Sequence, residues 1–227
     1  MIKLEKISKH YQSAGGQVVH KVLNDISLEI RKGDSIAIVG PSGCGKSTLL
    51  NLMGTLDLPT SGKIIFDGVE INTLDDKKLS ALRNKRIGFV FQMHHLLPQL
   101  NVLENILLPA LANSSKNQLK LTSEKAIQLL SEVGLKAHLY KFPGQLSGGE
   151  CQRVAVVRAL INEPDIILAD EPTGSLDYES AEQIGNLLVD LQTRKNMALM
   201  IVTHSLDLAN KMKTRYSLLN GQLNQLK

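Results

Sequence analysis

The stretch GPSGCGKST at residues 40–48 decides the fold of this 227-residue chain. It fits G-x-x-x-x-G-K-[ST], a glycine-rich loop that joins a buried strand to a helix and cradles phosphates. The apolar run SIAIV at 35–39 supplies the strand. Glycines let successive backbone N–H groups turn toward an anion, and the following helix points the positive end of its dipole at the same place. The sequence therefore predicts a nucleoside-triphosphate site.

Each residue of this loop has an expected part in that site. Lys46 is predicted to bridge the β- and γ-phosphates, and the Ser47 hydroxyl is predicted to ligate Mg²⁺. The predicted nucleotide-binding set in the loop consists of Gly40, Pro41, Ser42, Gly43, Cys44, Gly45, Lys46, Ser47 and Thr48.

A second acidic motif follows the apolar run IILA at 166–169, which ends in Asp170 and Glu171. Ligands of α/β sheets gather at the carboxyl ends of strands, so Asp170 is expected beside the phosphate loop, holding Mg²⁺ directly or through water. Glu171 is then placed to polarise the attacking water. By itself such a pair is more often a solvated turn, and only the loop at 40–48 favours the catalytic interpretation.

Fold class follows from the periodicity. Runs that are apolar throughout predict strands covered on both faces, and 178–194 and 122–134 carry helical stripes of apolar residues between or before them. The alternation predicts an α/β core with a mostly parallel sheet. Short strands at 2–9, 18–30 and 62–71 predict a flanking antiparallel β lobe. Residues 94–160 hold no convincing strand and predict a helical insertion, and the polar segment 113–120 is expected to be a surface loop.

Composition narrows the function classes. The chain is 43% hydrophobic and 21% charged with a net charge of +4, which is ordinary globular composition. It has no run of five or more Lys/Arg, so a nucleic-acid tail is not indicated. Its apolar runs are too short to span a bilayer, and no signal peptide is evident at the start. We expect a cytosolic protein whose two cysteines, Cys44 and Cys151, are free thiols.

Three further features separate one class from the many that use this loop. LSGGE at 146–150 places Ser147, Gly148 and Gly149 at the start of a helix, a second anion site by the same dipole logic. Gln92 ends the strand predicted at 87–91, and His204 ends the strand predicted at 198–202. Each of these features is common by itself, and it is their order along the chain that indicates one class of protein.

In that order the motifs resemble the ATP-binding domain of ABC transporters, over residues 2–222. The resemblance identifies LSGGE as the signature motif, Gln92 as the Q-loop glutamine and His204 as the switch histidine. It also makes SLD at 175–177 the D-loop, with Asp177 near the nucleotide, and places Tyr11 where an aromatic residue stacks on adenine. Catalytic roles are then expected for Glu171, His204, Gln92 and Lys46, and Mg²⁺ ligation for Ser47, Gln92 and Asp170.

The resemblance also implies a head-to-tail dimer with two ATP molecules, in which the signature of one copy completes the site of the other. It divides the single domain 1–227 into a RecA-like core with β lobe (1–92 and 161–227) and a helical subdomain (93–160). Glu150 and Cys151 depart from the family pattern, which has Gln and usually a polar or basic residue there. Glu150 is still expected to contact nucleotide.

The stretches 56–62, 93–98 and 169–177 resemble one branch of the family, which includes lipoprotein-releasing, macrolide-exporter and cell-division types. His94 and His95 before Leu-Leu-Pro favour the lipoprotein-releasing type, with the other two as alternatives. The partners implied are integral membrane permease subunits, which place the chain peripherally on the cytoplasmic face of a bacterial inner membrane. An ATP-binding module without turnover, and an ABC protein of DNA repair or translation, are the rival classes. Glu171 and His204 disfavour the first, and the short helical insertion disfavours the second.

Overall fold

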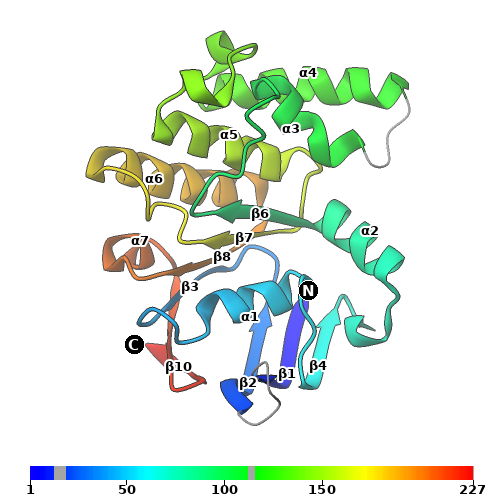
Figure 1. The fold of residues 1–227 in the computed structure, drawn as a ribbon, viewed down its shortest axis with the longest axis vertical. Helices are drawn as coiled ribbons and strands as arrows, with labels where there is room; N and C mark the ends of the chain where they lie inside the picture. The colour runs from blue at the N-terminus through cyan, green and yellow to red at the C-terminus, as the bar shows by residue number, and fades with distance from the viewer. Residues whose placement is uncertain (13–18, 112–115, 227) are drawn as a thin grey trace.

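The computed structural model describes residues 1–12, 19–111 and 116–226. Figure 1 shows a layered molecule, with helices above a large sheet and a helix and a second sheet below it. The large sheet has the strand order β10-β9-β3-β8-β7-β6, and the smaller one has the order β2-β1-β4-β5. This arrangement confirms the predicted α/β class with an antiparallel lobe.

The large sheet is parallel except at its β10 edge. Its strands are β3 (Ser35–Val39), β6 (Ile87–Phe91), β7 (Ile166–Asp170), β8 (Ala198–Thr203), β9 (Thr214–Leu219) and β10 (Gln222–Leu226). β3 pairs with β8 and β9, and β7 pairs with β8 and β6, all in parallel. Because parallel strands end at one edge, residues that follow β3, β6, β7 and β8 come together there.

The strands are apolar throughout because the sheet has a separate hydrophobic core on each face. Ile167, Ala169 and Ile201 belong to the core shared with the upper helices, while Leu168 and Met200 belong to the core shared with the β lobe. Side chains alternate between the two faces of a strand, so burial of both faces demands a continuous apolar run. The predicted strands at 35–39 and 87–91 have the observed bounds, and those at 166–169 and 198–202 each lengthen by one residue.

The antiparallel lobe contains β1 (Ile2–Gln12), β2 (Val19–Ile30), β4 (Ser61–Phe66) and β5 (Val69–Glu70), followed by a 3₁₀ turn at Ile71–Thr73. β1 lies between β2 and β4. α1 (Lys46–Met53) lies between this lobe and the large sheet, and its buried leucines belong to the lower core. α2 (Asp76–Arg86), which the sequence reading missed along with β9 and β10, connects the lobe to β6.

Above the sheet lie α3 (Val102–Leu111), α4 (Lys116–Glu132) and α5 (Gly148–Leu160), with 3₁₀ turns at Lys136–His138 and Pro143–Gln145. α6 (Tyr178–Lys195) packs between α5 and β8, and α7 (Leu206–Asn210) follows β8. The surface loop predicted at 113–120 is wrong for residues 116–120, which open α4, and 113–115 lie outside the described residues. The polar composition of 116–120 was the misleading signal, because a helix need not carry its apolar stripe in every turn.

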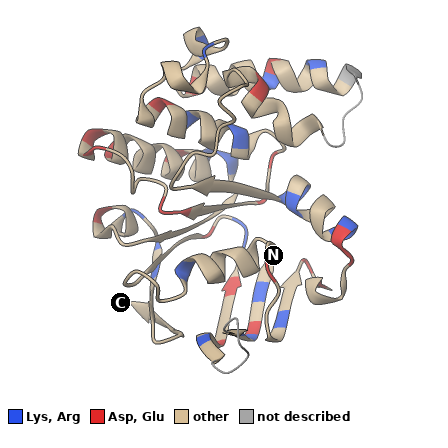
Figure 2. Ribbon diagram, in the orientation of Figure 1, with Lys and Arg blue, Asp and Glu red and all other residues tan. Residues whose placement is uncertain are grey.

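None of the helices in the described part of the chain is long and apolar enough to cross a membrane. Charged side chains are spread over both halves of the molecule (Figure 2).

Asn105 is the polar side chain that fixes the start of the helical insertion. It is fully buried in α3 and makes four hydrogen bonds, to the N–H and C=O of Leu97 and to the carbonyls of Leu100 and Asn101. One amide therefore holds the part of this segment from Leu97 to Asn101.

We expect Asn105→Ala to lower the free energy of unfolding by about 2–4 kcal/mol, because the change leaves buried backbone groups without partners. Chemical denaturation measures this loss. The exposed Asn186→Ala on α6 is the matched control and should stay within about 0.5 kcal/mol of the parent. Equal stability of the two variants would contradict the assigned role of Asn105.

Candidate nucleotide site

The glycines of the 40–48 loop are required by its tight path. A Cβ on Gly40 would lie 2.4 Å from the carbonyl oxygen of Leu218, so no larger residue fits. Gly45 has φ of +104° and sits directly against Val22, where an added Cβ would lie 2.9 Å from Cγ1. Positive φ is strained for residues with a Cβ, and glycine removes that cost. The loop is thereby held between β3 and α1, with its backbone at the carboxyl edge of the sheet.

Lys46 begins α1 and its ammonium group turns back onto the loop. Its Nζ donates to the carbonyl oxygens of Gly40 at 2.8 Å and Pro41 at 3.1 Å, and the residue is buried. Two backbone carbonyls thus hold the cation over the loop, where an anion bound to the N–H groups would meet it.

Ser47 and Asp170 meet across the edge of the sheet. The Ser47 hydroxyl lies close enough to the Asp170 carboxylate to act on its pKa. Burial raises the pKa of Asp170 and the neighbouring Glu171 charge adds to this, while Ser47 and Lys46 oppose the rise. The loop and the second acidic motif therefore lie at the same edge of the sheet.

This donor set suits Mg²⁺. Among the described residues no three His, Cys, Asp or Glu side chains are grouped so as to hold a metal ion by themselves. Mg²⁺ characteristically takes one or two protein oxygens and completes its shell with water and substrate phosphate. A hydroxyl and a carboxylate beside an anion-binding loop match that requirement.

Glu171 is locked in place by the end of β8. Its Oε2 accepts hydrogen bonds from the Thr203 hydroxyl at 2.9 Å and the His204 backbone N–H at 3.2 Å, and its Oε1 lies 3.0 Å from His204 Nδ1. The residue has φ of +45°, a strained conformation for a side chain with a Cβ. Its N–H donates to the Val202 carbonyl, which holds the strained turn. The fold thus orients one carboxylate with three groups.

Gln92 follows β6 and lies beside the 171–177 segment. Its carbonyl accepts from the Ser175 hydroxyl at 3.0 Å, and its side-chain amide lies against Gly174. The buried Gln152 of α5 donates to the carbonyl of Phe91 at 2.9 Å. These contacts join the end of β6 both to the acidic segment and to the helix that carries the LSGGE motif.

The LSGGE motif forms a capped helix start. Ser147 caps α5 by accepting from the Glu150 N–H, and Glu150 returns its carboxylate to the Ser147 N–H at 2.7 Å. This reciprocal bond lowers the pKa of Glu150. A carboxylate at this position therefore completes a capping box, which glutamine can also form. Asp177 similarly caps α6 by accepting from the Ser180 N–H at 2.9 Å.

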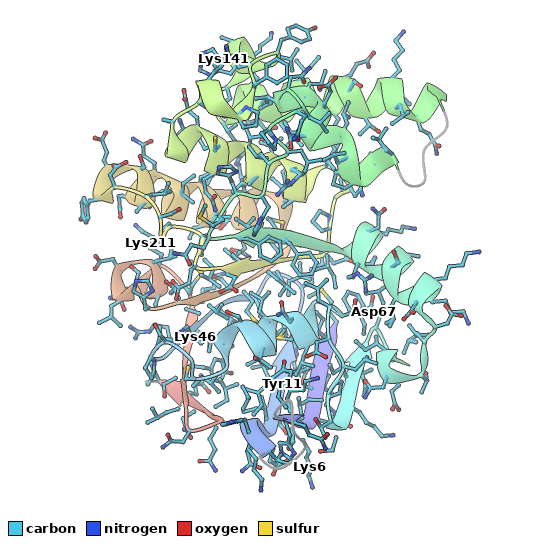
Figure 3. The ribbon with its side chains drawn as sticks, in the orientation of Figure 1. Lys6, Tyr11, Lys46, Asp67, Lys141 and Lys211 are labelled. Atoms are coloured by element: carbon cyan, nitrogen blue, oxygen red, sulfur yellow. The ribbon has the colours of Figure 1, made fainter. Side chains whose placement is uncertain are left out.

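Within one chain the two helix starts do not share a site. α1 lies below the large sheet and α5 above it (Figure 1). In Figure 3 the labelled Lys46 and Lys141, the latter just before the LSGGE motif, lie in opposite halves of the molecule. The fold gathers the loop, Asp170, Glu171, Gln92 and His204, and leaves Ser147–Gly149 apart from them.

An open hollow of about 580 Å³ flanks the loop. His20, Val22, residues 41–44 and the β9–β10 turn at 219–221 line it. Tyr11, at the end of β1, lies near α1, where Thr48 acts on the pKa of its phenol. The structure thus offers room beside the phosphate loop and an aromatic ring next to its helix.

Sequence reasoning missed three residues of this region. Thr203 donates to Glu171, Gln152 ties α5 to β6, and Asp57 accepts from Tyr11. Thr203 stands directly before the switch histidine, so its position was available as a signal. Asp57 and Gln152 had no such signal, because their contacts join segments 46 and 61 residues apart.

A phosphate-binding loop followed at the same sheet edge by an oriented carboxylate defines the class of P-loop nucleoside triphosphatases. The family model described as ABC transporter matches residues 23–174. The chain therefore belongs to the ABC transporter family, and its fold is that of the family's ATP-hydrolysing cassette.

Similar proteins support the same family. A Rhodopirellula baltica protein named lipoprotein-releasing system ATP-binding protein LolD 1 is 48% identical, over 98% of this chain and 96% of its own length. The LolD protein of Legionella pneumophila strain Paris is 47% identical over 96% and 95% of the two chains. Among solved structures, the dimeric bacterial ABC transporter cassette MJ0796 has a TM-score of 0.88 and 38% identity, covering 100% of this chain and 99% of that one. A post-hydrolysis dimer of that cassette, bound to ADP and Pi, has a TM-score of 0.86 and 36% identity over the same shares.

Cys44 is the accessible thiol of the phosphate loop. It is half-buried, whereas Cys151 is buried in α5, where burial raises the pKa of its thiol. Since thiolates are the reactive form, an alkylating reagent should select Cys44.

We expect complete alkylation of Cys44 to abolish most ATPase activity, because its side chain packs against the lower core and an added group would displace the phosphate loop. Phosphate release before and after treatment, with mass spectrometry of the modified residue, measures the effect. Cys44→Ala protein should resist the reagent. Full activity of quantitatively modified parent protein would remove the assignment of this loop to the phosphates.

Proposed function

We propose that this chain is the Mg²⁺-dependent ATPase of a lipoprotein-releasing transporter, working as a homodimer on separate membrane permease subunits. The observation that carries the proposal is the orientation of Glu171 by Thr203 and His204, one residue beyond the Asp170 that meets Ser47. A binding module without turnover has no need for a strained, triply held carboxylate at that place. The LolD relatives supply the transporter type.

The chain's own groups account for binding. Backbone N–H groups of residues 42–48, which include the start of α1, receive the phosphates, and Lys46, already held over the loop, pairs with their charge. Ser47 and Asp170 would hold Mg²⁺, and we keep Gln92 as a further ligand. When bound, the metal neutralises charge that develops on the phosphates.

Hydrolysis then requires an aligned water. Glu171 accepts a proton from this water. His204, whose Nδ1 lies 3.0 Å from Glu171 Oε1, stabilises the carboxylate and holds it in position. Gln92 connects this group to the rest of the molecule through Ser175 and the 171–177 segment. Positioning and electrostatics supply most of the catalysis in phosphoryl transfer, so the rigidity of Glu171 is the relevant property.

Closure of the site needs a second copy. Ser147, Gly148, Gly149 and Glu150 start α5 on the far side of the sheet from α1, so they can serve only another chain's nucleotide. A second helix start arriving in trans, with Asp177 nearby, excludes water from the γ-phosphate and completes its charge neutralisation. Gating of turnover by dimer closure follows. We retain the division into a core with β lobe (1–92 and 161–227) and a helical subdomain (93–160).

The permease is proposed to bind in a groove between the core with β lobe and the helical subdomain. The groove has a volume of about 400 Å³ and is lined by Leu56, Arg83, Phe91, Pro109 and Arg158, among others. Arg158 also donates to the carbonyls of His94 and His95 at 2.7 Å each, so it joins the groove to the segment that follows β6. A permease bound in this groove would lie next to the segment that begins after Gln92. The chain would then lie peripherally on the cytoplasmic face of a bacterial inner membrane.

The macrolide-exporter and cell-division types remain the alternative transporters. The segment with His94 and His95 favours lipoprotein release, as do the LolD relatives at 44–48% identity. An affinity-tagged chain, expressed in its own cell and extracted in detergent, tests this choice. Recovery of permease subunits that release lipoproteins from proteoliposomes on ATP addition supports the proposal, whereas recovery of a drug-efflux or cell-division partner overturns it.

We expect Glu171→Gln to reduce ATP turnover at least about 100-fold while ATP binding persists, because the amide keeps the shape and loses the base. Steady-state phosphate release measures turnover, and size-exclusion chromatography with ATP measures dimer formation, which should increase. Normal turnover of this variant would show that Glu171 is not the water-activating group.

Lys46→Ala is the contrasting variant. It should weaken nucleotide binding itself, since the loop loses the cation that its carbonyls hold in place. Titration with a fluorescent ATP analogue separates this binding defect from the turnover defect of Glu171→Gln. Unchanged affinity would place the phosphates elsewhere.

A further inference from the structure

Lys9, Tyr11 and Asp57 form a polar cluster at the end of β1. The Tyr11 hydroxyl donates to Asp57 Oδ2 at 2.9 Å, and Lys9 Nζ lies 2.7 Å from Asp57 Oδ1. Lys9 Nζ also lies over the Tyr11 ring, 4.9 Å from its centroid. One carboxylate therefore binds both the phenol and the cation that covers the ring.

The cluster is anchored to the phosphate-loop helix. Asp57 belongs to the segment that follows α1, and its carboxylate also accepts from the Leu58 N–H at 2.7 Å. Lys9 donates to the Leu58 carbonyl at 2.7 Å, and its side chain is only 12% exposed. Thr48, in the first turn of α1, lies near the Tyr11 phenol and opposes the rise in its pKa. The ring is thus tied to the segment that follows α1 and lies next to the first turn of that helix.

The charges in the cluster favour its persistence. Burial pushes the pKa of Asp57 upward, but hydrogen bonds from Lys9, Tyr11 and the Leu58 N–H outweigh it and leave the pKa below its usual range. Burial and the Asp57 charge raise the pKa of Tyr11, so the phenol stays protonated and remains a donor. Both partners therefore hold the required protonation state at neutral pH.

Tyr11 is only partly covered within this cluster. Lys9 lies over the Tyr11 ring, yet the residue is 42% exposed, so part of the tyrosine remains open for a ligand. An aromatic face beside a phosphate loop is suited to stack on a purine. The side chain has two rotatable bonds, and an untethered ring would have to be ordered when the base binds.

We propose that Asp57 and Lys9 are positioning residues that fix the Tyr11 ring for the purine base and so set the affinity for ATP. The inference rests on the proposed nucleotide site. Neither residue touches the phosphates, so their effect should fall on recognition of the base and leave the chemical step alone.

The first test compares Asp57→Ala with the parent in steady-state hydrolysis. One lost hydrogen bond of about 0.5–1.5 kcal/mol corresponds to a rise in KM for ATP of about two- to tenfold, with kcat within about twofold. Inorganic tripolyphosphate, which has no base, is used as a competitive inhibitor, and its inhibition constant should not change. A fall in kcat, or an equal weakening of tripolyphosphate, would indicate damage to the phosphate site and overturn the inference.

A double-mutant cycle tests whether Asp57 acts through Tyr11. Tyr11→Ala should raise the KM for ATP at least as much as Asp57→Ala, and adding Asp57→Ala to it should change nothing further. Tyr11→Phe keeps the ring and removes the donor, so it should give a rise similar to that of Asp57→Ala. Additive effects of Asp57→Ala and Tyr11→Ala would show that the two residues act independently.

Controls separate the possible failures. Glu70→Ala removes an ion pair with Lys63 at the β5 edge of the same lobe and should leave KM unchanged. Thermal melting establishes that each variant is folded. If Asp57→Ala is unstable, the two single variants Tyr11→Phe and Lys9→Met are measured in its place. A parent protein without ATPase activity would count against the proposed function, whereas an active parent with unchanged KM in all three variants would count against this inference alone.

Discussion

The parallel pairing of β7 with its neighbours is the constraint on which the site depends. Asp170 pairs in register with Val202 on one side and Phe91 on the other, so the residues that follow these strands emerge together. Glu171 can accept from Thr203 and His204 only in that register. A shift of one residue would turn every side chain of β7 to the opposite core. Because the strand is buried on both faces, such a shift is strongly resisted, and the geometry of Glu171 derives from the packing of the two cores.

Packing against the sheet also positions the phosphate loop at 40–48, which is the part of the site proposed to bind the substrate. The loop begins where β3 ends, and its glycines are forced by contact with Leu218 and Val22. Lys46 is held by loop carbonyls, and Ser47 reaches Asp170 across the sheet. The large sheet separates α1 from α5, so the loop and the LSGGE motif lie apart within one chain. In the proposed mode of action each nucleotide lies between the loop of one copy and the LSGGE motif of another, so turnover depends on a second copy.

The strands of the core and the functional motifs could be predicted from the sequence because both leave local marks. A strand buried on two faces is a continuous apolar run, as at 35–39, and a phosphate loop is a fixed pattern of glycines. Contacts between distant segments leave no such mark. Asp57 with Tyr11, and Gln152 with Phe91, became visible only in the fold. The start of α4 was misread because its sequence is polar. The capping role of Glu150 shows that a carboxylate is accommodated where the family pattern has Gln.

Complementation between two inactive copies tests the shared site most directly. Ser147→Arg blocks the helix start offered to a neighbour, and Lys46→Ala disables the chain's own loop, so each purified variant should have little ATPase activity. In a mixed dimer, the intact loop of the first variant meets the intact Ser147 of the second, which rebuilds one site. The account predicts that mixing the two restores a substantial fraction of the parent's phosphate release, while a chain that carries both changes restores none with either variant. If the mixture is as inactive as its components, the proposal that Ser147 serves the partner's nucleotide is contradicted.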